Sequence, residues 1–85
     1  MIKLRGEEIV WQSIEGEVVV LDLRSSVYLA VKGSGAVLWP QVVEGATRED
    51  LVGALVDRYA IPVEQAGRDV DAFVTMLRDR ELLGA

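Results

Sequence analysis

Two hydrophobic periodicities follow one another along the chain, and their order constrains the fold more than any other feature. Residues 8–31 alternate between apolar and other side chains, as β-strands with one buried face do. From residue 34 onward, apolar side chains recur every three or four positions, as they do in helices. We predict strands over residues 8–13, 17–23 and 27–31, joined by turns too short for parallel crossovers. The sequence therefore predicts an antiparallel three-stranded meander followed by helices.

Each of the first two helices has residues that indicate where it begins or ends. Ser34 is expected to cap the first helix, Pro40 to make it short or bent, and Gly45 to end it. Thr47 is expected to cap the second helix, with Asp50 at the position of a capping-box acid. These signals predict two short helices between residues 34 and 59.

A third helix is predicted over residues 63–81, because Ile61-Pro62 interrupts the helical pattern before it. Its apolar stripe repeats at helical spacing and consists of Ala66, Val70, Phe73, Val74 and Leu77. Trp11 and Trp39 are most simply interpreted as core residues. The predicted fold class is α+β, with the winged-helix-like layout of a meander followed by three helices.

Composition limits the possible functions of the chain. Its 85 residues make one domain, 1–85, with no room for a second core. The sequence has no cysteine and no histidine, so we expect no thiol nucleophile, catalytic pair, metal site or cofactor. The net charge of −5 disfavours nucleic acid, which favours basic surfaces. No apolar run resembles a signal peptide or a membrane span, so a cytoplasmic location without membrane association is expected.

The third strand and one flank of the third helix together predict a binding groove. An outer strand of a meander has a free edge, usually protected by charge or proline, and residues 27–31 contain neither. Either another part of the chain covers this edge, or the edge receives an extended peptide. Beside the core stripe, Met76 and Ala72 extend apolar character along one flank, whereas Glu64, Asp71 and Arg78 make the opposite flank polar. A methionine beside such a stripe is more often core filler than a contact residue, so core packing is the alternative interpretation of Met76.

Several ordered segments of the sequence resemble PqqD-like proteins. The run Tyr28 to Trp39, with Gly33-Ser34-Gly35 at its centre, is similar to the family's "Y..LN.tG..iW" segment. Gly45-Ala46-Thr47 matches the "G.t" before its second helix, and Leu82-Leu83 matches the terminal "GLL". The resemblance extends over about residues 9–83.

PqqD-like proteins are RiPP recognition elements: they bind the leader segment of a ribosomally made precursor peptide and present it to modifying enzymes. The resemblance implies that the leader adds as a strand beside the third strand and lies against the third helix. The implied contact set is Val27, Tyr28, Leu29, Ala30, Val31, Asp69, Ala72, Phe73, Met76 and Arg80.

Two departures from the family pattern affect the choice of pathway. Lys32 stands where the family often has asparagine, and the turn Arg24-Ser25-Ser26 lacks the Pro-Glu-Gly sequence of PQQ-type members. The resemblance therefore favours the stand-alone leader-binding adaptors of lasso peptide biosynthesis, whose implied partner is a transglutaminase-like cysteine protease that removes the leader. A peptide chaperone of pyrroloquinoline quinone biosynthesis is the first alternative.

Two other functions share some of these features. A winged-helix DNA-binding domain has the same layout, but Arg68, Arg78 and Arg80 point in different directions around the third helix. A small enzyme would have to rely on carboxylates, tyrosines, serines or lysines, and no pair of them has diagnostic spacing. Open strand edges also pair with each other, so a homodimer through the third strand is a further expected arrangement.

Overall fold

The computed structural model describes residues 1–84 and contains three strands followed by three helices. The strands β1 (Ile9–Ile14), β2 (Glu17–Asp22) and β3 (Val27–Val31) form one antiparallel sheet in the order β1-β2-β3. The expected order of elements and the α+β class are confirmed. The first strand lies one residue later than predicted, and the second ends one residue earlier.

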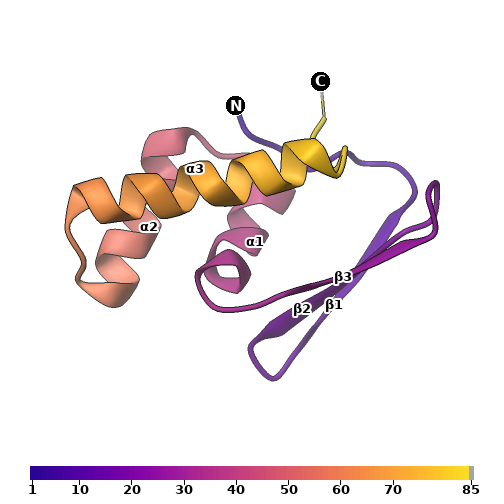
Figure 1. Cartoon of the computed structure of the whole chain (residues 1–85), viewed down its shortest axis with the longest axis horizontal. Helices are drawn as coiled ribbons and strands as arrows, with labels where there is room; N and C mark the ends of the chain where they lie inside the picture. The colour runs from indigo at the N-terminus through magenta and orange to yellow at the C-terminus, as the bar shows by residue number, and fades with distance from the viewer. Residues whose placement is uncertain (85) are drawn as a thin grey trace.

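The helices are α1 (Ser34–Glu44), α2 (Arg48–Tyr59) and α3 (Val63–Asp79). In Figure 1 they lie on one side of the molecule, with the sheet on the other. The third helix ends two residues before the predicted boundary at Glu81. Its predicted apolar stripe is buried throughout, as the helical spacing indicated.

The core lies between the inner face of the sheet and the helices. Val18 and Val20 of β2 and Val31 of β3 point into it. The largest fully buried side chains are Trp39, Leu38, Leu51, Leu55, Leu77, Val20, Val42 and Val70. Trp11 was expected in the core, but it is 41% exposed and only touches the core edge-on, with its ring centroid 6.0 Å from that of Trp39. β1 is an edge strand whose residues beyond Ile9 are all exposed, which explains this error.

The helix ends follow most of the sequence signals. The Thr47 hydroxyl accepts from the Asp50 N–H at 3.1 Å and the Asp50 carboxylate accepts from the Thr47 N–H at 3.0 Å, which confirms the capping box. The expected Ser34 cap is wrong: Ser34 is the first residue of α1, and Gly33 precedes it with a φ of 60° and no side-chain cap. A positive φ favours glycine at this sharp turn. The helix continues through Pro40 for eleven residues and ends at Gly45, as predicted.

Residues 2–5 form an N-terminal strap outside the sheet. The strap hydrogen-bonds to the end of α1 and to Ala46 just after it, and also to the C-terminal segment. Ile2 and Ala46 exchange two backbone hydrogen bonds of 2.6 and 2.9 Å, and the Leu4 N–H donates to the Val42 carbonyl at 2.9 Å. The Gly84 N–H donates to the strap at 2.8 Å. The strap therefore bonds to α1 and to the C-terminal segment, and within residues 1–84 none of its hydrogen bonds reaches β3.

Candidate functional site

The alternation of hydrogen-bonded and non-hydrogen-bonded residue pairs decides which backbone groups face the edges of the sheet. The turn at Glu15 and Gly16 places Ile14 opposite Glu17, and the Leu23 N–H donates to the Glu8 carbonyl at 2.8 Å. Both pairs are therefore hydrogen-bonded pairs of the β1–β2 ladder. Because such pairs alternate along an antiparallel ladder, residues 18, 20 and 22 of β2 turn their N–H and C=O groups toward β3 instead.

The same alternation gives the direction of every backbone group in β3. Three residues of β3, Val27, Leu29 and Val31, lie opposite residues 22, 20 and 18 of β2, whose N–H and C=O groups face β3. The backbone groups of these three residues therefore bond to β2. Tyr28 and Ala30 consequently present their N–H and C=O groups to the outer edge. Within residues 1–84, these four groups make no hydrogen bond to another part of the protein. The edge of β3 is therefore available for a further strand.

A groove runs between this edge and α3. One end is a cavity of about 330 Å³ whose lining includes Ala30 and Val31 on the strand side and Ala72 and Met76 on the helix side. The other end is a cavity of about 240 Å³ between Leu29 and the end of α3. A third hollow on α3 shares Ala72 and Met76 with the first cavity and Asp79 and Arg80 with the second. The first and second cavities, each lined by residues of β3 and α3, form the groove. The third hollow lies on α3 between them and extends to Asp71 and Thr75 on the other flank of the helix, beyond the groove.

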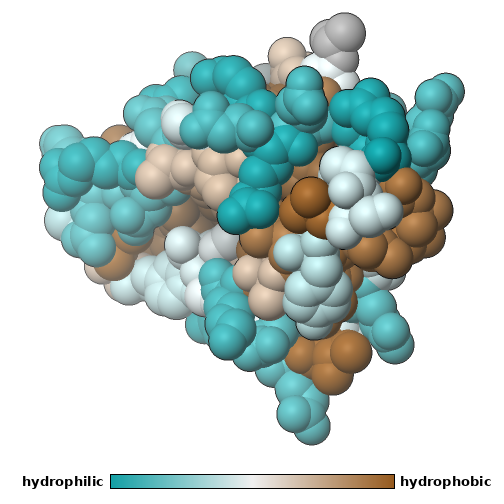
Figure 2. Space-filling model, turned by 45° about the vertical axis from the view of Figure 1, so that its right-hand side comes forward, coloured by the Kyte–Doolittle hydropathy of each residue, from teal (hydrophilic) through white to brown (hydrophobic). Residues whose placement is uncertain are grey.

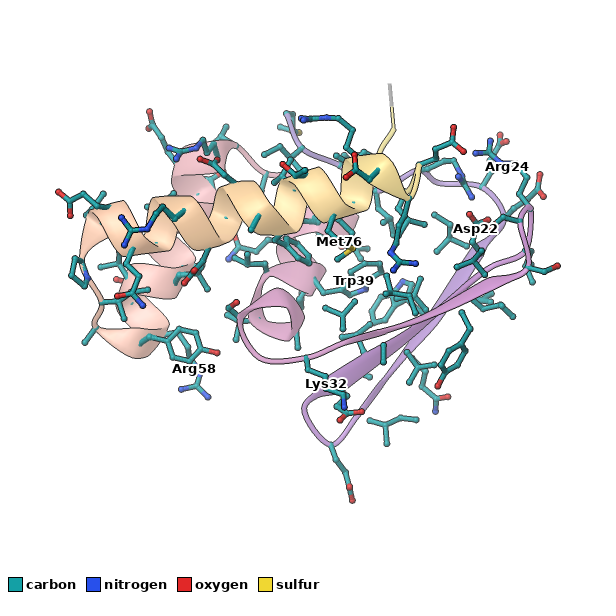
Figure 3. All side chains as sticks on the ribbon, viewed as in Figure 1. Asp22, Arg24, Lys32, Trp39, Arg58 and Met76 are labelled. Atoms are coloured by element: carbon teal, nitrogen blue, oxygen red, sulfur yellow. The ribbon has the colours of Figure 1, made fainter. Side chains whose placement is uncertain are left out.

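Apolar side chains line much of this groove. Figure 3 shows Met76 on the side of α3 that faces the sheet, where its side chain is half-buried. Phe73 lines the same cavity and is only 7% exposed. Figure 2 shows apolar surface exposed on the strand side, below the hydrophilic outer face of α3. The flank of α3 that sequence analysis singled out is therefore the flank that faces β3.

Nine of the ten residues expected from the sequence line the groove. The first cavity is lined by four residues of α3, Asp69, Ala72, Phe73 and Met76, and the second by Arg80, which directly follows that helix. On β3, Ala30 and Val31 line the first cavity, and Val27 and Leu29 line the second. Tyr28 is the exception, because its side chain lies on the outer face of the sheet and is 66% exposed. Only its backbone groups face the edge.

Sequence reasoning missed Gly35 at the first cavity. A Cβ on Gly35 would lie 2.8 Å from a Val31 methyl and 3.2 Å from the Phe73 ring, so glycine permits the close approach of α1 to β3 and α3. Nothing in the local sequence distinguishes this role from that of a helix-start glycine.

Sequence reasoning also missed Asp22 at the second cavity, although alternation offered a signal. Asp22 is the one charged residue on the inner face of β2 and is 4% exposed. Its carboxylate accepts from the Arg5 guanidinium at 2.7 Å and from the Arg24 N–H at 3.0 Å. Burial raises the pKa of this carboxyl, but the hydrogen bonds outweigh burial and the net pKa is lowered. Asp22 is therefore held ionised by its partners.

Two further ion pairs are present among residues 1–84. The Lys32 ammonium, at the first cavity, lies 3.3 Å from the Glu17 carboxylate. Arg48 and Asp71 form a two-bond ion pair of 2.8 and 3.1 Å between α2 and α3, on the opposite flank of α3. The pair hydrogen-bonds strongly enough to lower the pKa of Asp71. Among residues 1–84, no cluster of acidic side chains suits a metal ion, and no helix is long and apolar enough to cross a bilayer.

Comparisons with known proteins agree with this geometry. The chain is similar to two solved structures, TbiB1 in complex with the TbiA(β) leader peptide and lasso peptide synthetase B1 complexed with the leader peptide. The first has 29% sequence identity and a TM-score of 0.89, and covers 98% of this chain and 95% of that chain. The second has 26% identity and a TM-score of 0.83, and covers 98% and 96%. No curated protein gives a significant match.

A family model agrees with these structures and with the resemblance drawn from the sequence. The model described as coenzyme PQQ synthesis protein D (PqqD) matches residues 17–83. That stretch contains β2, β3 and all three helices, and hence both walls of the groove. The chain therefore belongs to the PqqD family.

Proposed function

We propose that this protein binds the leader segment of a lasso precursor peptide by adding it as a strand to β3. The observation that carries the proposal is the outer edge of β3, where Tyr28 and Ala30 offer four unpaired backbone groups beside an apolar flank of α3. The two similar solved structures are both complexes with leader peptides, which supports this choice of ligand.

The backbone of β3 would supply binding that does not depend on the leader's sequence. Four edge hydrogen bonds at about 0.5–1.5 kcal/mol each amount to about 2–6 kcal/mol. Selectivity would come from alternate leader side chains, because successive residues of an added strand point to opposite faces. One face of the added strand would turn inward, toward Phe73 and Met76 at one end and Leu29 at the other.

The proposed contact set is the one that the sequence indicated. It comprises the five residues of β3, four residues of α3 and Arg80, which directly follows that helix: Val27, Tyr28, Leu29, Ala30, Val31, Asp69, Ala72, Phe73, Met76 and Arg80. Tyr28 would contribute through its backbone, since its side chain lies on the outer face of the sheet.

The protein would act in the cytoplasm as an adaptor and would leave the chemistry to a partner. Removal of a leader requires peptide-bond cleavage, and the sequence has neither the cysteine nor the histidine of the commonest nucleophile–base pairs. We therefore propose delivery of the bound leader to a leader peptidase of the transglutaminase-like cysteine protease type.

The test uses a synthetic leader segment of the lasso precursor peptide that the proposal implies as the cognate partner. Calorimetry should show saturable one-to-one binding, and NMR should show the largest amide changes at Tyr28 and Ala30, with smaller ones on the Met76 flank. A matched scrambled peptide of the same composition is the control. Absence of heat together with unchanged β3 amides would refute leader binding at this edge.

A second candidate function is a peptide chaperone in pyrroloquinoline quinone biosynthesis, which the family model's description favours. The same calorimetry with the pyrroloquinoline quinone precursor peptide separates the two candidates. Tighter binding of that peptide than of the lasso leader would move the protein to the second pathway.

A further inference from the structure

Arg5 occupies a fixed position at one end of the groove. Its backbone N–H donates to the Leu82 carbonyl at 2.7 Å, so the strap holds the residue from its main chain. The Arg5 side chain is only 14% exposed. Residues 2–5 lie outside the stretch 17–83 that the family model matches.

The Arg5 guanidinium connects the end of β2 with the segment just after α3. No other hydrogen bond among residues 1–84 joins these two places. One terminal nitrogen donates to the Asp22 carboxylate at 2.7 Å, at the end of β2. The other donates to the Glu81 carbonyl, just beyond the end of α3. Asp22 and Glu81 both line the second cavity of the groove. Figure 3 labels Asp22 and Arg24 at this end of the sheet.

A side-chain bridge at this place suits a strand-receiving groove, because such a groove cannot be closed by its own edge. If the backbone groups of β3 bonded to α3, no guest could reach them. The Arg5 bridge connects the two walls without using any backbone group of that edge. A guanidinium is suited to this task, since its donors form a rigid planar fork and it stays charged when buried.

We propose that Arg5 is a positioning residue that sets the width of the leader groove by tying the end of α3 to the end of β2. This inference rests on the proposed function for its consequence in binding. Its geometric part concerns the free protein. Without the Arg5 bridge, the β2–β3 turn and the end of α3 vary in separation, and a guest strand loses a preformed wall.

The geometric part can be measured without any peptide. Because the chain has no cysteine, the double substitution Arg24→Cys and Asp79→Cys allows specific spin labelling of opposite walls of the second cavity. Dipolar electron paramagnetic resonance should give a narrow distance distribution for the labelled protein. Adding Arg5→Met should broaden or shift that distribution, and an unchanged distribution would overturn the proposal.

The binding part is measured by calorimetry with the synthetic lasso leader on unlabelled variants. Arg5→Met should weaken binding about tenfold or more. The affinity of Arg5→Lys should fall between those of Arg5→Met and the parent protein, because one ammonium cannot reproduce the forked donors of a guanidinium. Arg48→Met is the matched control: it removes the Arg48–Asp71 ion pair outside the groove, so any loss of stability should leave affinity within about twofold.

The outcomes separate the two proposals. If Arg5→Met binds the leader like the parent protein, Arg5 is not a positioning residue, whatever the melting temperature does. If Arg48→Met loses as much affinity as Arg5→Met, general destabilisation explains both and the proposal is overturned. If the parent protein itself does not bind the leader, the proposed function fails, and the spin-label distances alone decide whether Arg5 sets the groove width.

Discussion

A proline at Ala30 tests strand addition most directly, because the register assigns the Ala30 N–H to the outer edge of β3. The substitution Ala30→Pro removes one donor at about 0.5–1.5 kcal/mol and leaves a guest carbonyl unsatisfied at about 1–3 kcal/mol. We expect a total loss of about 2–4 kcal/mol, which is about 30- to 700-fold in affinity. The fold should survive, since proline is tolerated where a strand edge faces solvent. Calorimetry with the lasso leader and circular dichroism measure the two effects.

Two matched substitutions make this result interpretable. Ala30→Thr keeps the N–H and changes only a side chain that alternation places on the exposed outer face of the sheet, as for Tyr28, so its affinity should stay close to that of the parent. Leu29→Pro removes a donor that bonds to β2, so it should lower the melting temperature sharply instead of acting on binding. If Ala30→Pro binds within about threefold of the parent with an unchanged dichroism spectrum, β3 is not the receiving edge. The free edge of β1 would then be the next place to examine.

Three further predictions concern the groove and its support. Met76→Asp should weaken leader binding about 30-fold or more, since it places a carboxylate against an apolar guest, whereas Met76→Leu should bind normally; calorimetry compares them. Gly35→Ala should lower stability by about 1–3 kcal/mol in chemical denaturation, because its Cβ would lie 2.8 Å from Val31; unchanged stability would refute this packing argument. The lowered pKa of Asp22 should stabilise the fold fully above about pH 5, and this stability should be lost as the pH falls through the native pKa; Asp22→Asn should flatten that part of the pH profile of melting temperature.

The elements of this fold could be predicted from the sequence because their signals are local. Alternation along residues 17–31 identified the strands, and the spacing of the α3 stripe identified both its buried face and the flank carrying Met76. A helix turns by about 100° per residue, so the position of one stripe fixes every other direction around it. The Thr47 capping box was equally local, and it is present as predicted.

The features that could not be predicted depend on contacts between distant residues. Arg5 and Asp22 are 17 positions apart, and Arg5 and Glu81 are 76 apart, so no periodicity links them. The exposure of Trp11 depends on how far the helices extend over β1, which the strand pattern does not record. The prediction of a Ser34 cap was wrong for a related reason. The chain turns sharply at Gly33, with a φ of 60°, where β3 passes into α1.

The length of a turn determines which backbone groups of β3 are free. A two-residue turn makes Ile14 and Glu17 a hydrogen-bonded pair. Because hydrogen-bonded pairs alternate along each ladder, this pair also determines that the N–H and C=O groups of Ala30 face the outer edge. One residue more or less in either hairpin would exchange the inward and outward groups. The sheet has two open edges, however, and this alternation alone does not choose between them. Among the described residues, only the edge of β3 has the apolar flank of α3 beside it. The helix thus selects the edge, and the turns select the groups on it that a guest strand can bond.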